Sequence, residues 1–213
     1  MAATDPHAES AERFTRDTAH HQMTVLHDDG LYRHLRFRAP EHGAYWFDLI
    51  TWPYNLVITG DMDAFHFSRA GSDTEDMPTL FRGRRINPGY WAGKLRAGRA
   101  DAQEYSEAVF AQTVWTYVRE GGQEYRGLAK AVQAEIFDTG YSLDEQTARE
   151  ALEDFEHADA DTAKGREFRF HDVWEMSFKD WTAQYLWACH AIVWGIRQYD
   201  QARAAMPAEA VTR

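Results

Sequence analysis

The chain has 213 residues and a formal net charge of −11 at neutral pH, and hydrophobic residues make up 44% of it. A chain of this length and apolar content can bury a sizeable core, which excludes a disordered protein and favours one domain. The single cysteine, Cys189, excludes an internal disulfide and a cysteine metal cluster, so a reducing compartment is expected.

The N-terminal residues, 1–21, are polar and charged where a secretory signal would need an apolar run. No run of about eighteen apolar residues, the length that spans a bilayer, occurs in the sequence. We therefore expect a cytoplasmic protein that does not span a membrane. We also expect a flexible N-terminal arm over residues 1–22, a single α+β domain over residues 23–203 and a flexible tail over residues 204–213.

The first third of the chain has the pattern of short β-strands. Five segments are rich in aromatic or β-branched residues and are bounded by turn residues; they are residues 23–27, 31–38, 44–52, 56–59 and 64–69. The connections between them are too short for crossover helices, so neighbouring strands should run antiparallel in sequence order. The sequence therefore predicts a β-meander of about five strands.

Alternation assigns the two faces of this sheet. In the second segment Leu35 and Phe37 point to one side of the sheet. The other side is polar and carries Tyr32, His34, Arg36 and Arg38. The third segment is aromatic on both sides, which is typical of a central strand that is covered on part of both faces.

The rest of the chain has helical patterns. We expect short helical turns at residues 77–81 and 90–95, and longer helices over residues 101–120 and 124–137. The Ser142 to Glu145 segment resembles a capping box and predicts a helix that ends near residue 156. A final helix, from Phe178 or Asp180 to about Arg203, is apolar around most of its circumference and should cross the sheet as the centre of the core. The predicted fold is α+β, with the antiparallel meander packed against a layer of helices.

Charge is distributed unevenly along the sequence. Residues 101–161 contain fifteen acidic and four basic side chains, whereas residues 77–100 contain six basic and no acidic ones. These segments are either solvated surfaces or the surfaces that recognise a partner. The candidate binding residues are Glu150, Glu153 and Asp154 at the acidic pole, and Arg82, Arg84, Arg85, Tyr90 and Trp91 at the basic one.

A longer pattern carries a resemblance. It consists of YWFDLITWP at residues 45–53, LVITGDM at 56–62, FHFSR at 65–69, INPGYW at 86–91 and parts of residues 185–200. This pattern resembles one that recurs in uncharacterised proteins encoded by tailed phages and prophages. The resemblance implies a phage accessory protein that acts in the bacterial cytoplasm, against a host or defence protein.

Carboxylates and histidines near the predicted strands are the candidates for catalysis. Asp48 and Asp61 lie near His66 in the sequence pattern, and His34 lies on a second strand. Asp61 and Asp63 also bracket a turn, in which aspartate commonly bonds the local backbone. No H-E-x-x-H or C-x-x-C motif occurs, so we expect neither a metal site nor a cofactor.

Three functions fit these observations. The favoured one is a phage accessory protein that binds a host or phage macromolecule through its acidic surface and inhibits a bacterial defence system. The first alternative is a single-stranded nucleic-acid-binding protein that uses residues 82–99. The second is a hydrolase or metal-dependent enzyme with an Asp and His site beside the sheet, although a binding protein is favoured over an enzyme.

Overall fold

The computed structural model describes residues 6–71, 74–83, 85–122, 124–138, 144–158 and 167–205. They form two compact units: Met1–Gln103 with Trp181–Arg213 is the first unit, and Glu104–Asp180 is the second. We expected a single domain over residues 23–203. The difference has a physical reason, because the acidic middle of the chain buries its own cluster of aromatic and aliphatic side chains.

The predicted β-meander is confirmed in the first unit, with six strands in sequence order and every neighbouring pair antiparallel. The strands are β1 (Gln22–Asp29), β2 (Tyr32–Arg38), β3 (Phe47–Trp52), β4 (Asn55–Gly60), β5 (Asp63–Ser68) and β6 (Leu95–Ala97). The sixth strand begins at Leu95, where we had placed the end of a helical turn. It forms because Leu95 pairs with Phe67 of β5 and is buried.

The two faces of the sheet differ as the alternation predicts. Leu35 and Phe37 of β2 are buried in the core, whereas His34 and Arg36 are partly exposed. Strand β3 lies between β2 and β4, which confirms its central position. The alternation of side chains along each strand therefore decides which residues face the core and which face away from it.

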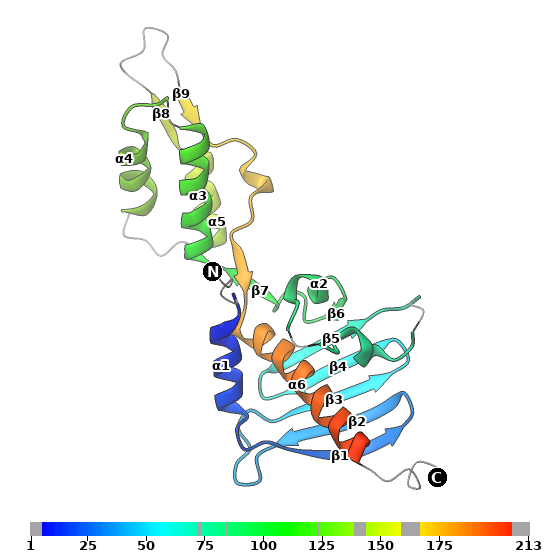
Figure 1. The fold of residues 1–213 in the computed structure, drawn as a ribbon. Coiled ribbons are helices and arrows are strands. Elements are labelled where there is room, and N and C mark those ends of the chain that lie inside the picture. Colours follow the sequence, from blue (N-terminus) through cyan, green and yellow to red (C-terminus); the bar gives the residue numbers. More distant parts are fainter. Residues whose placement is uncertain are drawn as a thin grey trace, which may run out of the picture. The chain divides into compact units, whose positions relative to one another are not determined.

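Helices cover one face of this sheet. They are α1 (Ala8–Asp17), the 3₁₀ helix η1 (Met77–Leu80), α2 (Pro88–Ala92) and α6 (Ala183–Ala205). Helix α6 crosses the sheet diagonally, as predicted for the C-terminal helix (Figure 1). Gly195 permits this close approach, because a Cβ atom there would lie 2.7 Å from Leu49 Cδ1 and 3.1 Å from Phe37 Cζ.

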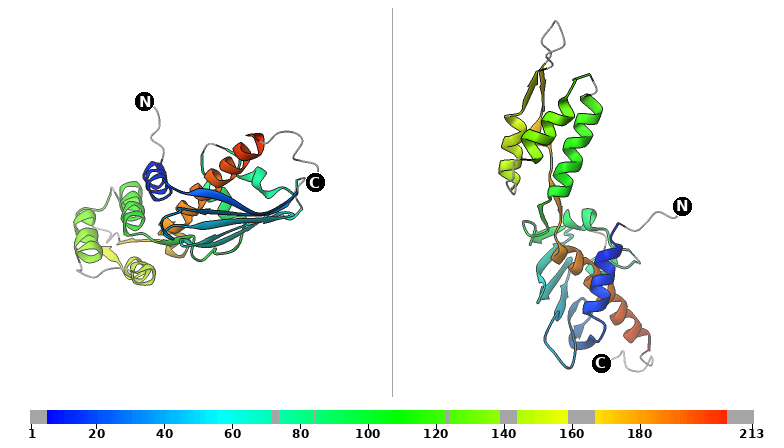
Figure 2. Two further views of the ribbon diagram at one scale, coloured as in Figure 1. Left: turned by 90° about the horizontal axis from the view of Figure 1, so that it is seen from below. Right: turned by 90° about the vertical axis from the view of Figure 1, so that its left-hand side faces the viewer.

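The N-terminal arm that we expected to be flexible contains helix α1. Phe14 is only 5% exposed, and its ring packs edge-on against Trp187 of α6 with the centroids 5.2 Å apart. The Ser10 hydroxyl lies 2.9 Å from Nε2 of His190, also on α6. Helices α1 and α6 lie on the same face of the sheet (Figure 2). The segment is polar apart from Phe14, so its sequence did not predict a helix that packs on the core.

The second unit is mainly helical. It contains α3 (Glu107–Gly121), α4 (Leu128–Val132), the π-helix η2 (Gln133–Phe137), α5 (Glu145–Glu153), strands β8 (Glu156–Ala158) and β9 (Glu167–Arg169), and the 3₁₀ helix η3 (Val173–Glu175). The chain enters this unit through β7 (Gln103–Tyr105) and leaves it through β10 (Lys179–Trp181), which pair with each other. The pair β8 and β9 is antiparallel.

Helix boundaries in the second unit differ from those predicted because other residues cap the helices. Ser106 is the N-cap of α3, and its hydroxyl accepts from the Val109 N–H at 3.3 Å, so this helix begins after residue 101. Asp144 caps α5 by accepting from the Thr147 N–H at 2.7 Å, where we expected Ser142. Residue 142 lies outside the described residues.

Candidate functional site

The first candidate group lies on strands β2 and β3 of the first unit. Asp48 is only 4% exposed, and its carboxylate accepts hydrogen bonds from Arg36 Nε at 2.9 Å and Arg36 Nη2 at 2.8 Å. His34 Nε2 lies 2.7 Å from the same carboxylate. The three residues meet because β2 and β3 pair Arg36 with Asp48, and positions two apart on a strand share a face.

These contacts determine the charge state of Asp48. Its burial is the largest single influence and raises the pKa, but the hydrogen bonds and charges of Arg36 and His34 together outweigh it and lower the pKa below the ordinary value. Asp48 is therefore an ionised acceptor at neutral pH, and it orients the Arg36 guanidinium and the His34 ring. A carboxylate that orients a histidine is also the arrangement that supports a general base.

His34 borders an open depression on this face of the sheet. The depression has a volume of about 550 Å³ and is lined by His27, Asp29, Tyr32, Arg33, His34, Ile50, Thr51 and Trp52. The structure thus brings together His34 and Asp48, which the enzyme hypothesis requires beside the sheet.

The other two catalytic candidates lie apart from this group in their contacts. His66 Nε2 is 2.8 Å from Asn55 Oδ1, and its ring packs on Trp52; burial, with the nearby charge of Arg96, lowers its pKa. The Asp61 carboxylate accepts from the Tyr45 N–H at 2.8 Å. Asp61 therefore holds the backbone of the turn before β3.

Two of the five candidates in residues 82–91, Arg82 and Trp91, have contacts that support the fold. Arg82 donates to Asp200 at 2.9 and 3.1 Å and to Asp76 at 3.1 Å. Trp91 is 3% exposed and packs on Phe81 in the core, so its ring is not available for stacking on a ligand.

The other three candidates of this segment are Arg84, Arg85 and Tyr90. Tyr90 and Arg85 are exposed, and Lys94 lies 5.1 Å from the Tyr90 ring centroid. Arg84 lies outside the described residues.

The acidic candidates lie in the second unit and are accessible. Residues 104–180 carry 18 acidic and 8 basic side chains, a net charge of −10, whereas the first unit carries 16 acidic and 15 basic ones. Glu150, Glu153 and Asp154, on and just after α5, are all exposed. Nearly the whole charge imbalance of the protein therefore belongs to the second unit.

Sequence reasoning missed a residue that stands out in this unit. Trp174, on η3, is 72% exposed, and Asp172 and Glu175 beside it are exposed as well. The turn is held from α5, because Arg149 donates to the backbone carbonyls of Val173 and Met176, the latter at 3.1 Å. The signal in the sequence was a tryptophan between acidic residues in a polar segment.

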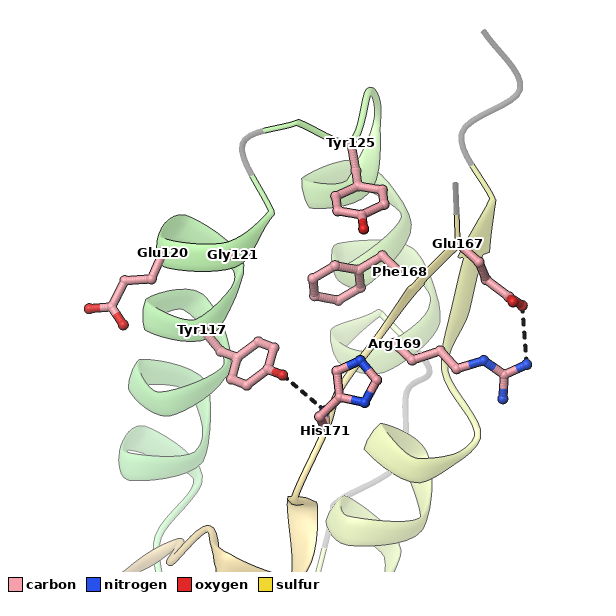
Figure 3. Close-up of a pocket in the computed structure, with 8 residues that line it drawn as sticks. All are labelled: Tyr117, Glu120, Gly121, Tyr125, Glu167, Phe168, Arg169 and His171. Atoms are coloured by element: carbon pink, nitrogen blue, oxygen red, sulfur yellow. Dashed lines mark hydrogen bonds and ion pairs between the residues drawn. The ribbon is translucent and has the colours of Figure 1, made fainter. Parts of the chain in front are cut away.

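The second unit also contains a cavity of about 410 Å³, drawn in Figure 3. Its walls come from α3, the segment after it and β9, and they consist of Tyr117, Glu120, Gly121, Tyr125, Glu167, Phe168, Arg169 and His171. The Tyr117 hydroxyl accepts from the His171 backbone N–H at 2.9 Å, and Arg169 donates to Glu167 at 3.1 Å. The one arginine of the lining is thus partnered by a carboxylate of the same lining.

Cys189 is fully buried in α6, and burial raises the pKa of its thiol, which disfavours the reactive thiolate. Over the described ranges, no group of three or more His, Cys, Asp or Glu side chains is arranged to hold a metal ion. In the same part of the chain, no helix has both the length and the apolar character needed to cross a bilayer.

Comparisons with protein-family models, with curated proteins and with solved structures found no match to this chain.

Proposed function

We propose that this protein is a phage accessory protein that binds a basic surface of a host or phage protein through its acidic second unit. The observation that carries the proposal is the concentration of charge: residues 104–180 have a net charge of −10, whereas the first unit is nearly neutral. Such a field attracts a positively charged partner and raises the rate of encounter.

Trp174 would add an apolar contact to the electrostatic attraction of the acidic residues. Tryptophan is among the residues that most often dominate the energy of protein interfaces. Trp174 is 72% exposed and lies on a turn whose carbonyls accept hydrogen bonds from Arg149 and whose Val173 is buried. Because the turn is held before binding, little conformational entropy is lost on association. The partner would offer an apolar pocket bordered by Lys or Arg.

The phage setting rests on the resemblance of residues 45–69, 86–91 and 185–200 to phage and prophage proteins. In that setting a host partner would belong to a cytoplasmic defence system, and inhibition of that system is the role that we infer. A defence protein that binds nucleic acid has the basic groove that an acidic surface can occupy.

Affinity capture from phage-infected bacterial cells, with three variants beside the wild type, tests the proposal. The first variant reverses the charge of Glu150, Glu153 and Asp154 to lysine, and the second is Trp174→Ala. The matched control reverses three exposed acidic residues of the first unit to lysine, which are Glu9, Glu12 and Glu41. Circular dichroism verifies that all variants are folded.

We expect one or a few proteins to be retained by the wild type and the control, lost from the Glu150, Glu153 and Asp154 variant, and reduced with Trp174→Ala. Retention should weaken as salt rises, because exposed charges are screened. The proposal fails if the charge-reversal variant and the control retain the same proteins with the same salt dependence.

A further inference from the structure

Motif residues that are separate in the sequence converge where the chain enters β3. Tyr45 has a φ of 60°, in the left-handed region that bulky residues rarely adopt. Its N–H donates to the Asp61 carboxylate at 2.8 Å, and its carbonyl oxygen lies 2.9 Å from His21 Nε2. A backbone in such a conformation persists only where the surroundings hold it.

The next residue, Trp46, is held by the turn between β4 and β5. The Asp61 N–H donates to the Trp46 carbonyl at 3.0 Å. Gly60 packs directly beneath that carbonyl, since a Cβ atom at residue 60 would lie only 2.2 Å from the oxygen. The Gly60-Asp61 pair therefore fixes the position of the Trp46 backbone.

Arg36 is held against the Trp46 ring. Its guanidinium carbon lies 5.3 Å from the centroid of the indole, within the range of a cation–π interaction. Asp48 accepts from Nε and Nη2 of the same guanidinium, and the other terminal nitrogen, Nη1, takes no part in these two bonds. The Trp46 ring and the Asp48 carboxylate thus hold the Arg36 guanidinium in one orientation before any ligand binds.

A cavity of about 310 Å³ adjoins this pair, and it is lined by Arg36, Arg38, Gly43 and Trp46. Arg38 is exposed and lies two residues beyond Arg36 on the same face of β2. The volume is at the small end of ligand pockets, which run from about 300 to 1,000 Å³. Two guanidinium groups beside an indole are suited to a ligand that combines an anionic group with a planar ring.

We propose that this cavity binds a nucleotide, with its phosphate on Arg36 and Arg38 and its base against Trp46. Guanidinium groups bind phosphate oxygens in a forked geometry, and bases of every kind stack on aromatic side chains. The nucleotide is either free or part of a single strand, because both present the same phosphate and base. This site lies in the first unit, does not depend on the acidic second unit, and uses none of residues 82–99.

Isothermal titration of the full chain tests the site with four probes: adenosine 5′-monophosphate, adenosine, inorganic phosphate and a single-stranded DNA of five adenines. The variants are Arg38→Gln and Trp46→Leu, and the matched control is Arg16→Gln, another exposed arginine of the first unit. Arg38→Gln is the decisive variant, since an exposed side chain can change without loss of the fold.

We expect the monophosphate to bind, adenosine and phosphate to bind at least about tenfold more weakly, and Arg38→Gln to weaken monophosphate binding by about tenfold or more. Arg16→Gln should bind as the wild type does. Tighter binding of the five-adenine strand, with an affinity that falls as salt rises, would identify single strands as the source of the nucleotide; equal affinities would identify free nucleotides.

Three outcomes would overturn the inference. They are an absence of binding by both the monophosphate and the strand up to about 1 mM, equal binding of phosphate and monophosphate, and unchanged binding by Arg38→Gln.

Discussion

The guanidinium of Arg36 donates two hydrogen bonds, 2.9 and 2.8 Å long, to the carboxylate of Asp48 on the neighbouring strand. The carboxylate is almost fully buried, while the arginine side chain is 41% exposed. This asymmetry makes Asp48 the more sensitive member of the pair, because its remaining access to water is small.

Replacement of Asp48 by asparagine should lower the free energy of unfolding by about 1–3 kcal/mol, the range for hydrogen bonds to charged groups. Urea denaturation measures this loss. Glu41→Gln, which neutralises an exposed carboxylate of the same unit, should change stability by less than about 0.5 kcal/mol. Equal effects of the two substitutions would contradict a structural role for Asp48.

The stabilisation by Asp48 should depend on pH in the acidic range. Its pKa in the folded protein lies below the ordinary value of 3.8, so near and below pH 3.8 the unfolded chain binds more protons than the folded one. Its contribution is therefore fully present above that pH and is lost as the pH falls through the lowered pKa. The stability difference between wild type and Asp48→Asn should be constant near pH 6 and should shrink below about pH 4; a difference that grows on acidification would contradict this assignment.

Gly60→Ala should destabilise the first unit, because the added methyl group would collide with the backbone carbonyl of Trp46 and with the Phe47 Cα atom. We expect a loss of about 1–3 kcal/mol or more in thermal or urea unfolding. Gly43→Ala is the matched control, since a Cβ atom there meets nothing within 4 Å. If both glycines tolerate alanine equally, the close approach of Gly60 to Trp46 is not present in solution.

Phe14→Ala should release helix α1 from α6. The phenylalanine ring packs on Trp187 and Trp194, with centroids 5.2 and 6.0 Å away, so its removal leaves a cavity against α6. Hydrogen exchange should then accelerate at the amides of Ala8–Asp17 and stay unchanged in β3. Glu12→Ala, an exposed position on the same helix, should leave exchange in α1 nearly unchanged. Fast exchange of α1 in the wild type would instead favour the flexible arm.

The meander and the helix that crosses it could be predicted because their signals are local. Short connections between apolar segments leave antiparallel pairing as the one simple solution, and a helix that is apolar on most sides has to be central. The N-terminal arm could not be predicted in this way, since α1 depends on one buried residue, Phe14, among polar neighbours.

For the candidate residues, too, the sequence predicted some features and tertiary contacts decided others. Residue types marked Asp48, His34 and the acidic segment as candidates before any fold was known, whereas strand register decided that Asp48 meets His34 and Arg36. Packing decided that Trp91 is buried and that Trp174 is exposed. Periodicity and composition report on neighbours along the chain. Burial and the meeting of side chains depend on contacts between distant segments, and these exist only once the chain has folded.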